Sequence, residues 1–305
     1  MKMISKRTTV ESDTTNGKTE KFTICRVDTS GLQEVGSSKG LVPYLKEIWA
    51  RRDYITADAK AKAFRTTRDY KWWRFWLIGS PLLEALLYGF MFGVLLKTSR
   101  GVENFVGFVI IGITLFGAMN RLLMAGVGLI EANKGMIRAF SFPTAAITFS
   151  VILRYIYDLT PSVIIASIVA LLFQLNFTPP GATAFFAVIV FALTLLFGAG
   201  LTFITARLTS FLPDFRAILE LFSRGWMFAS GIFYSMERYA TNPLVYNLFS
   251  ANPAYQYITA FRKCLLYNQI PSVSEWTSLF CWGIGTFSFG ILFFWQAEDR
   301  YKQES

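Results

Sequence analysis

Six long apolar segments are the feature that most constrains how this chain can fold. A bilayer core about 30 Å thick is crossed by roughly 20 helical residues, so an apolar run longer than about 18 residues predicts a membrane span. With 53% hydrophobic and 16% charged residues, the chain of 305 residues is too apolar for an ordinary soluble domain. The sequence therefore predicts an all-α polytopic membrane protein with six transmembrane helices. The predicted spans lie near residues 75–96, 105–130, 145–173, 181–206, 215–236 and 276–297.

The Lys and Arg residues are distributed unevenly about these spans. Residues 1–75 contain 16 of the 30, and the segments 131–143, 207–216 and 298–305 contain two each. Because cytoplasmic loops carry an excess of Lys and Arg, both termini are expected in the cytoplasm. The formal charge of +10 then follows from membrane topology, and no nucleic acid partner is expected. The five basic residues on the other side are Lys97, Arg100, Arg238, Arg262 and Lys263.

The N-terminal region precedes the first predicted span. Residues 1–40 are polar without a sustained period and predict a flexible cytoplasmic tail, while residues 41–70 predict an amphipathic interface helix. No apolar core lies near Met1, so we expect no cleavable signal peptide. Gly17-Lys18-Thr19 is similar to the end of a phosphate-binding loop, but Ser12 stands where the first glycine is required, which argues against nucleotide binding. The expected interfacial residues are Trp49, Arg65, Arg68, Trp72, Trp73 and Trp76.

The chain contains no histidine and three cysteines, Cys25, Cys264 and Cys281, without C-x-x-C spacing. A disulfide framework and histidine-based acid–base or metal chemistry are therefore excluded. We expect no metal site, no catalytic residue and no cofactor bound by this chain. The composition favours a conduit over a catalyst.

Six ionisable residues fall inside the predicted spans. Each costs about 2.5–3.5 kcal/mol at the centre of a membrane helix, so each should be paired or face water. Arg154 with Asp158, and Glu220 with Arg224, are four residues apart and are predicted to pair within one helix. Glu84 and Arg121 could pair across the first two spans or face a hydrated passage. The six are Glu84, Arg121, Arg154, Asp158, Glu220 and Arg224.

The segment between the last two spans, residues 237–275, is rich in aromatic residues and proline. It predicts short external helices that return toward the membrane, with a solvated loop as the alternative. Glycines in the last span, Gly283, Gly285 and Gly290, predict close helix packing, either within one chain or between two.

Four motifs follow one another between residues 41 and 300. Their order resembles the permease subunit of an ABC-2 type transporter, in the subgroup that exports lipid-linked polysaccharides such as O-antigen, teichoic acid or galactan. The resemblance implies an ABC-2 transmembrane domain over residues 71–300, a cytoplasmic tail over 301–305 and location in a prokaryotic plasma membrane. The motifs are Arg65-Thr66-Thr67-Arg68 leading through Trp76 to Pro81-Leu82-Leu83; residues 131–138 followed by Phe142-Pro143; Leu212-Pro213-Asp214-Phe215-Arg216; and residues 230–234 with Asn252-Pro253 and Phe261-Arg262-Lys263.

The resemblance also implies partners. Two copies of the chain would stand side by side as a homodimer among membrane lipids, above two copies of a cytoplasmic ABC ATPase that binds ATP and Mg. The chain itself would be a transport subunit and not an enzyme. Its coupling helix would lie in a groove of the ATPase and would comprise Glu131, Asn133, Lys134, Gly135, Met136, Ile137 and Arg138.

We expect the two copies to enclose a channel lined mainly by the first and fifth spans. Aromatic rings can pack on the C–H faces of sugars, although packing against lipid or neighbouring helices is the alternative for such rings. The candidate wall residues are Tyr88, Phe92, Trp226, Phe233 and Tyr234.

Three other functions remain open from the sequence. The nearest is export of a small hydrophobic drug or a lipid on the same scaffold. An intramembrane enzyme should carry clustered polar catalytic groups, and the sequence has no such cluster. A purely structural scaffold is the third.

Overall fold

The computed structural model describes residues 6–12, 20–26, 40–63, 104–139, 143–174, 181–234 and 249–304, together with Gly79, Leu83, Leu87 and Asn247. The chain divides into a small N-terminal unit and a helical unit that begins at Lys39.

The N-terminal unit contains a β-hairpin that the sequence analysis did not predict. Strand β1, Lys6–Ser12, pairs antiparallel with strand β2, Glu20–Arg26, in a register that joins Thr8 to Ile24 and Val10 to Phe22. β-branched and aromatic residues favour such strands. These two strands fall within residues 1–40, for which the sequence predicts a flexible tail, and the all-α prediction applies to the helical unit.

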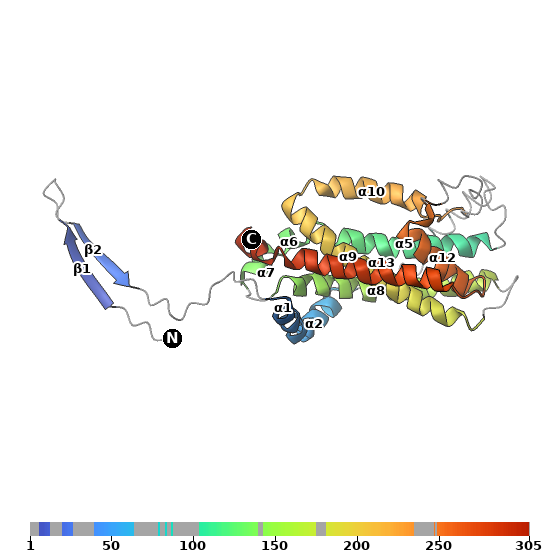
Figure 1. Ribbon diagram of the computed structural model, residues 1–305, viewed down its shortest axis with the longest axis horizontal. Coiled ribbons are helices and arrows are strands. Elements are labelled where there is room, and N and C mark those ends of the chain that lie inside the picture. The colour runs from blue at the N-terminus through green and yellow to red at the C-terminus, as the bar shows by residue number, and fades with distance from the viewer. Residues whose placement is uncertain are drawn as a thin grey trace. The chain divides into compact units, whose positions relative to one another are not determined.

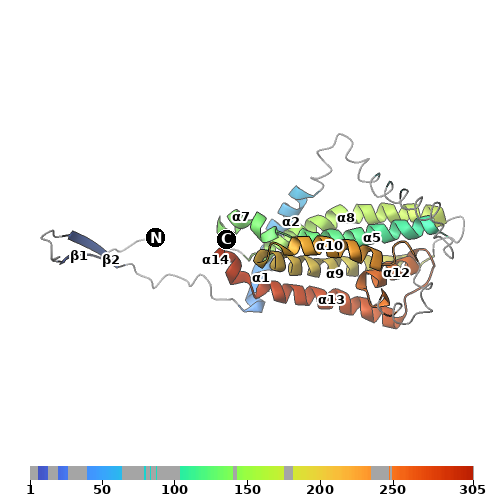
Figure 2. The same cartoon turned by 90° about the horizontal axis from the view of Figure 1, so that it is seen from above.

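The described part of the helical unit is built from long helices that lie side by side, with short helices at both ends and along one side (Figures 1 and 2). We call the end that carries α6, α7 and α14 the α7 end, and the opposite one the α12 end. The helices are α1 Leu41–Ala50, α2 Arg52–Lys62, α5 Phe105–Ala125, α6 Leu129–Ala132, α7 Lys134–Ala139, α8 Ala145–Gln174, α9 Ala184–Phe211, α10 Phe215–Ala229, α12 Pro253–Leu265, α13 Val273–Trp295 and α14 Glu298–Glu304.

Four of these helices, α5, α8, α9 and α13, are long and apolar enough to cross a membrane. They match the second, third, fourth and sixth predicted spans. The first predicted span lies outside the described residues except for Gly79, Leu83 and Leu87, which are helical and four residues apart. The predicted interface helix is divided at Arg51 into α1 and α2, and residues 64–70 of its range lie outside the described segments.

The fifth predicted span is shorter than expected. Helix α10 has 15 residues and ends at Ala229, whereas the apolar run continues to Met236. The chain leaves the helix at Ser230, and Gly231 takes the left-handed conformation with a φ of 62°. Glycine adopts this backbone conformation without the steric cost that a side chain adds.

Helices α5 and α13 both approach α9 closely. A Cβ on Gly290 of α13 would come within 2.5 Å of the Gly200 carbonyl oxygen of α9. The hydroxyls of Thr202 and Thr205 donate to the carbonyls of Leu122 and Leu123 on α5, at 2.7 and 2.8 Å. Small residues and hydroxyls of this kind join helices where apolar burial offers little driving force. For Gly290 this decides the open question, because the close packing is within one chain.

Helix α12 is inserted into the end of the bundle against α5 and α9, so this part of the segment 237–275 is a packed helix and not a solvated loop. Asn252 caps it by accepting from the Ala254 N–H at 3.0 Å, and Pro253 occupies its first turn, where no N–H is needed. Its inner face carries Tyr257 and Arg262, both fully or almost fully buried.

The Arg262 guanidinium joins three elements at the α12 end. It donates to the Phe108 carbonyl of α5 at 2.7 and 3.0 Å, and to the carbonyls of Gly231 and Ile232 after α10 at 3.0 Å each. Its carbon lies 3.3 Å from the centroid of the Phe108 ring, a cation–π geometry. A Cβ on Gly112 would lie 2.4 Å from this guanidinium, so Gly112 leaves the space that it occupies.

Replacing Arg262 with Met should destabilise the helical unit strongly. The methionine fills part of the volume but leaves the carbonyls of Gly231 and Ile232 without this donor, at a cost of about 3 kcal/mol or more. Thermal unfolding of the purified protein in detergent measures the loss. Lys263→Met is the matched control, because its ion pair with Glu275 is partly exposed and such pairs contribute about 0–1 kcal/mol. Equal unfolding temperatures of the two variants would contradict the assigned role of Arg262.

Candidate functional site

Two short helices, α6 and α7, connect α5 to α8 at the α7 end. The turn into α6 passes through Gly128, whose φ is 67°. The Asn133 amide donates to the Leu129 carbonyl at 2.8 Å, and the Lys134 ammonium lies 3.3 Å from the Glu131 carboxylate. The residues that the sequence assigns to coupling thus form one compact segment, in which Asn133 closes the turn between the two helices.

The α6–α7 segment has a buried and an exposed face. Ile137 is buried in the second apolar cluster of the unit, and Met136 packs against that cluster. Glu131, Ala132 and Gly135 are exposed. The backbone of Arg138 belongs to α7, while its side chain is outside the described atoms. A partner protein would therefore contact the face of Glu131, Ala132 and Gly135.

A buried carboxylate connects this end of the molecule. Glu298, at the start of α14, accepts from the Tyr44 hydroxyl of α1 at 2.8 Å. It also accepts from the Thr144 N–H at 2.8 Å and from the Thr144 hydroxyl at 3.0 Å, immediately before α8. Glu298 is 7% exposed, and burial together with its carboxylate raises the pKa of the Tyr44 phenol well above the usual range. The phenol stays protonated and keeps donating. We call Tyr44, Thr144 and Glu298 the Glu298 junction.

Helix α2 is attached to the same region by two further contacts. The Tyr54 hydroxyl reaches the Met136 sulfur of α7 at 3.4 Å. The Asp58 carboxylate accepts from the Ser150 hydroxyl of α8 and from the Lys62 ammonium, the latter at 2.9 Å. Because α1, α2, α7, α8 and α14 are joined by these contacts, a force applied to α7 would be shared by all of them.

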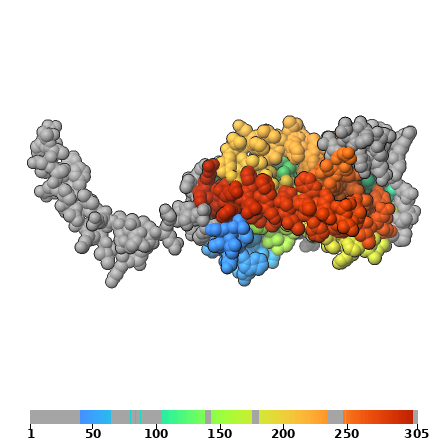
Figure 3. Space-filling view, viewed as in Figure 1, coloured from blue at the N-terminus to red at the C-terminus, as the bar shows by residue number. Residues whose placement is uncertain are grey.

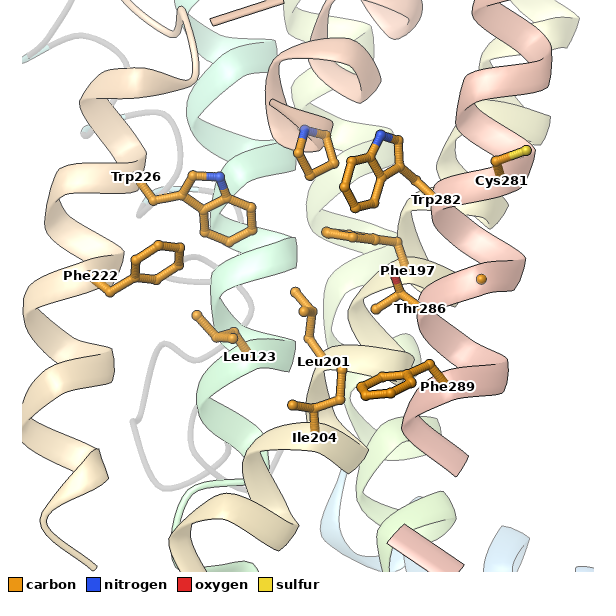
Figure 4. Close-up of a pocket in the computed structure, with 12 residues that line it drawn as sticks. Leu123, Phe197, Leu201, Ile204, Phe222, Trp226, Cys281, Trp282, Thr286 and Phe289 are labelled. Atoms are coloured by element: carbon orange, nitrogen blue, oxygen red, sulfur yellow. The ribbon is translucent and has the colours of Figure 1, made fainter. Parts of the chain in front are cut away.

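A cleft opens on the face where α10 lies beside α9 and α13 (Figure 4). Its volume is about 530 Å³. Phe222 and Trp226 project into it from α10, and Trp282 and Phe289 from α13 (Figure 4). The side chains that line it are otherwise apolar apart from Thr286 and Cys281. The remaining lining residues are Leu123, Phe197, Leu201, Ile204, Pro253 and Gly285.

The rings in the cleft form a connected array. Trp226 stacks on Phe222 at 5.7 Å between centroids and meets Phe197 at 6.5 Å, and Phe197 meets Trp282 edge-on at 6.4 Å. The Trp226 indole N–H donates to the Asn252 side chain at 2.8 Å, which fixes the ring. The same side chain donates to the Ala229 carbonyl at 3.0 Å. Asn252 of the Asn-Pro motif therefore holds the cleft wall in place.

The predicted channel residues have different surroundings in the structure. Trp226 lines the cleft. Phe233 is 2% exposed and belongs to the apolar core, so it presents no surface to a passing molecule in this structure. The Tyr234 hydroxyl donates to the Phe228 carbonyl at 2.6 Å. Tyr88 and Phe92 lie outside the described residues.

The intramembrane charges also differ in outcome. Arg154 and Asp158 form the predicted ion pair at 3.7 Å. Glu220 pairs with Arg216 at 3.1 Å, one turn before it, and not with the predicted Arg224. Arg121 is exposed on α5, and Glu84 lies outside the described residues.

Of the predicted interfacial residues, Trp49 is 71% exposed on α1, as an anchor in the headgroup region would be. The others lie outside the described residues: Arg65, Arg68, Trp72, Trp73 and Trp76.

Sequence reasoning missed the Glu298 junction and most of the cleft. Tyr44 and Glu298 are 254 positions apart, and neither stands in a motif. Phe222, Trp282 and Phe289 are single aromatic residues in apolar helices, without a pattern that separates them from lipid-facing rings.

Residues 58–266 match the family model of the ABC-2 type transporter. The chain is also 19% identical over 204 residues to the O-antigen export system permease protein RfbA of Myxococcus xanthus, covering 67% of this chain and 76% of that protein. The chain thus belongs to the ABC-2 type transporter family, and its apolar helices make it a multi-pass membrane protein. The predicted ABC-2 permease is confirmed.

Replacing Glu298 with Leu should loosen the α7 end. The Tyr44 hydroxyl and the Thr144 N–H would lose a charged acceptor, and leaving a buried donor unsatisfied costs about 1–3 kcal/mol. Hydrogen exchange at α1 and at the start of α8 measures the loss, which we expect at both places together. Tyr44→Phe should raise exchange at α1 alone. If Glu298→Leu leaves exchange unchanged at both, the junction does not hold these elements.

Proposed function

We propose that this chain is the permease subunit of an ATP-driven exporter of lipid-linked polysaccharide, with its α7 end and both termini in the cytoplasm of a prokaryotic plasma membrane. The membership of the ABC-2 family and the similarity to an O-antigen export permease support this proposal. So does the placement of Lys and Arg, which predicts a cytoplasmic N-terminus and α6–α7 connection.

The observation that carries the proposal is the α6–α7 segment. It offers an exposed face for a partner, while its buried face and its neighbours are joined to α1, α2, α8 and α14. A cytoplasmic ABC ATPase docked on that face would transmit its movement into the bundle through these contacts. ATP and Mg would then be bound by two ATPase copies, beneath two copies of this chain.

The aromatic cleft supports a glycan as the transported molecule. Indole and phenyl rings pack on the apolar faces of sugar rings, and Phe222 and Phe228 of α10 are exposed. In a homodimer with α10 at its centre, such rings would face the passage. We accordingly assign the polymer path to the α10 side.

A second candidate function is export of a small hydrophobic drug or a lipid. The observation that favours it is the lining of the cleft, in which none of the twelve described residues carries a charge. An apolar pocket of this volume is of the kind that holds small molecules.

Gly135→Trp should abolish substrate-linked ATP hydrolysis. A Cβ at Gly135 meets no atom within 4 Å, so a large side chain is accommodated in the isolated chain but stands on the face assigned to the ATPase. The measurement is co-purification with the ATPase and hydrolysis in proteoliposomes. Gly135→Ala is the control and should keep both. Normal coupled hydrolysis in the tryptophan variant would remove the assignment of this face.

Phe222→Ala should lower polymer export several-fold and leave assembly with the ATPase intact, because it removes an exposed ring from the proposed path. Polymer at the cell surface is measured in a strain that depends on this chain. Phe185→Ala, an exposed ring on α9 outside the cleft, is the control and should export normally. Unchanged polymer export with lowered resistance to a hydrophobic drug would support the second candidate function instead.

A further inference from the structure

A second apolar groove lies between α1–α2 and the spans α8, α9 and α13, and shares no residue with the aromatic cleft. Its volume is about 630 Å³. Ile48 and Ile55 line it from the short helices, Phe149 and Ile156 from α8, and Ala199 from α9. Figure 3 shows α1 and α2 (blue) beside α13 (red) on this face of the molecule. Of the described residues that line it, Arg52 is the single charged one.

The groove runs along the spans. On α8 it extends from Phe149 to Ile156, and on α9 from Ala199 to Ala192, which is about 10 Å on each helix at 1.5 Å per residue. Both stretches lead away from the α7 end, since α8 begins there and α9 ends there. The groove is therefore an elongated apolar slot that begins at the amphipathic helices and enters the depth of the membrane.

Contacts of both α1 and α2 hold this slot open. Asp58 fixes α2 to Ser150 of α8, and Tyr44 fixes α1 to Glu298. Between them the chain bends at Arg51, so α1 and α2 bridge the slot. Ala192 and Ala199 are too small to fill the space beneath. An apolar space of this size does not hold ordered water without polar partners, so a hydrocarbon chain is the fitting occupant.

The charged end of the slot matches an anionic headgroup. The Arg52 side chain is 56% exposed and lies 5.8 Å from the centroid of the Trp49 ring, which is itself exposed. Its Nε is 4.0 Å from the well-exposed Asp53 carboxylate, a contact that solvent screens. Indole rings prefer the headgroup level, and basic residues on an interfacial helix attract anionic lipids.

We propose that this groove binds one acyl chain of an anionic phospholipid, with the headgroup phosphate at Arg52. The lipid would come from the leaflet at the α7 end. It would brace α1–α2 against α8, and through the contact of Tyr54 with Met136 it would stabilise the position of α7. This lipid is distinct from the transported molecule, which we assign to the α10 side.

The test is lipid binding to the full-length protein, purified in detergent and titrated with phosphatidylglycerol or with phosphatidylcholine of the same acyl chains. Native mass spectrometry counts the bound lipids. We expect the wild-type protein to retain one phosphatidylglycerol more tightly than phosphatidylcholine. Arg52→Glu should weaken phosphatidylglycerol binding at least about five-fold, from the loss of about 1 kcal/mol per basic residue.

Two further variants separate the groove from general charge effects. Arg51→Glu changes the neighbouring residue, which does not line the groove, and should leave the tight lipid in place. Glutamate at either position stands at the start of α2, where a negative charge is favourable, so both proteins should fold. Ala192→Trp fills the deep part of the groove from its exposed position and should remove the tight lipid with Arg52 intact.

Three results would overturn the proposal: equal retention of the two lipids by the wild-type protein, equal loss in Arg51→Glu and Arg52→Glu, or a tight lipid that persists in Ala192→Trp. A changed oligomeric state in Ala192→Trp with an unchanged lipid count would instead make the groove an interface between copies. None of these measurements depends on the ATPase or on export, so failure here leaves the proposed function untouched.

Discussion

The backbone carbonyls at the α12 end depend on one guanidinium. Within a membrane domain every backbone polar group needs a partner inside the protein, and the place where α10 stops is where the helix cannot supply one. Arg262 supplies it by donating to Gly231 and Ile232, and it reaches them because Gly112 has no side chain. This arrangement sets where α10 ends and where α12 packs. Asn252, immediately before α12, then sets the orientation of the Trp226 ring.

The same reasoning explains what the sequence predicts well. Apolar runs with the length of a membrane crossing predicted α5, α8, α9 and α13 within a few residues, because one physical requirement, covering the hydrocarbon core, sets both length and composition. The same requirement predicted too long a helix at α10. The apolar run continues past Ala229, and hydropathy cannot report that Gly231 turns the chain or that a distant arginine captures its carbonyl. The charge pattern places Arg262 on the side of the membrane opposite the termini, but it does not show that this side chain is buried in the protein.

Residue spacing alone also did not identify the ion-pair partner of Glu220 or the hairpin in the N-terminal unit. The rule of four residues allows Glu220 two partners, Arg216 and Arg224, and the structure uses the first. In the N-terminal unit, β-branched and aromatic residues at Thr8, Val10, Phe22 and Ile24 flank Asn16-Gly17, a common turn signal. The sequence analysis compares Gly17 with a phosphate-binding loop and does not predict the hairpin. The Glu298 junction lies beyond any local rule, since Tyr44 and Glu298 come from the two ends of the helical unit and Thr144 from between them.

The two ends of the molecule are suited to different tasks. At the α12 end, backbone carbonyls and the buried Arg262 guanidinium hold α12 and the end of α10 together beside the aromatic cleft. At the α7 end, polar side chains join the short helices to one another, through Tyr44 and Tyr54, and to the first turns of α8 and the residue before it, through Asp58 and Glu298. A shift of α7 would disturb its contact with Tyr54 of α2, and a shift of α1 would disturb the bond of Tyr44 to Glu298, which also holds Thr144 before α8. A movement that begins at α7 would therefore reach α2, α1 and the start of α8 through these contacts, while α12 at the other end is held by Arg262. Between the two ends, α10 is bonded to α5 by the Ser223 hydroxyl, which donates to the Asn120 side chain at 2.6 Å, and to Asn252 by Trp226, while its exposed apolar face forms one wall of the cleft.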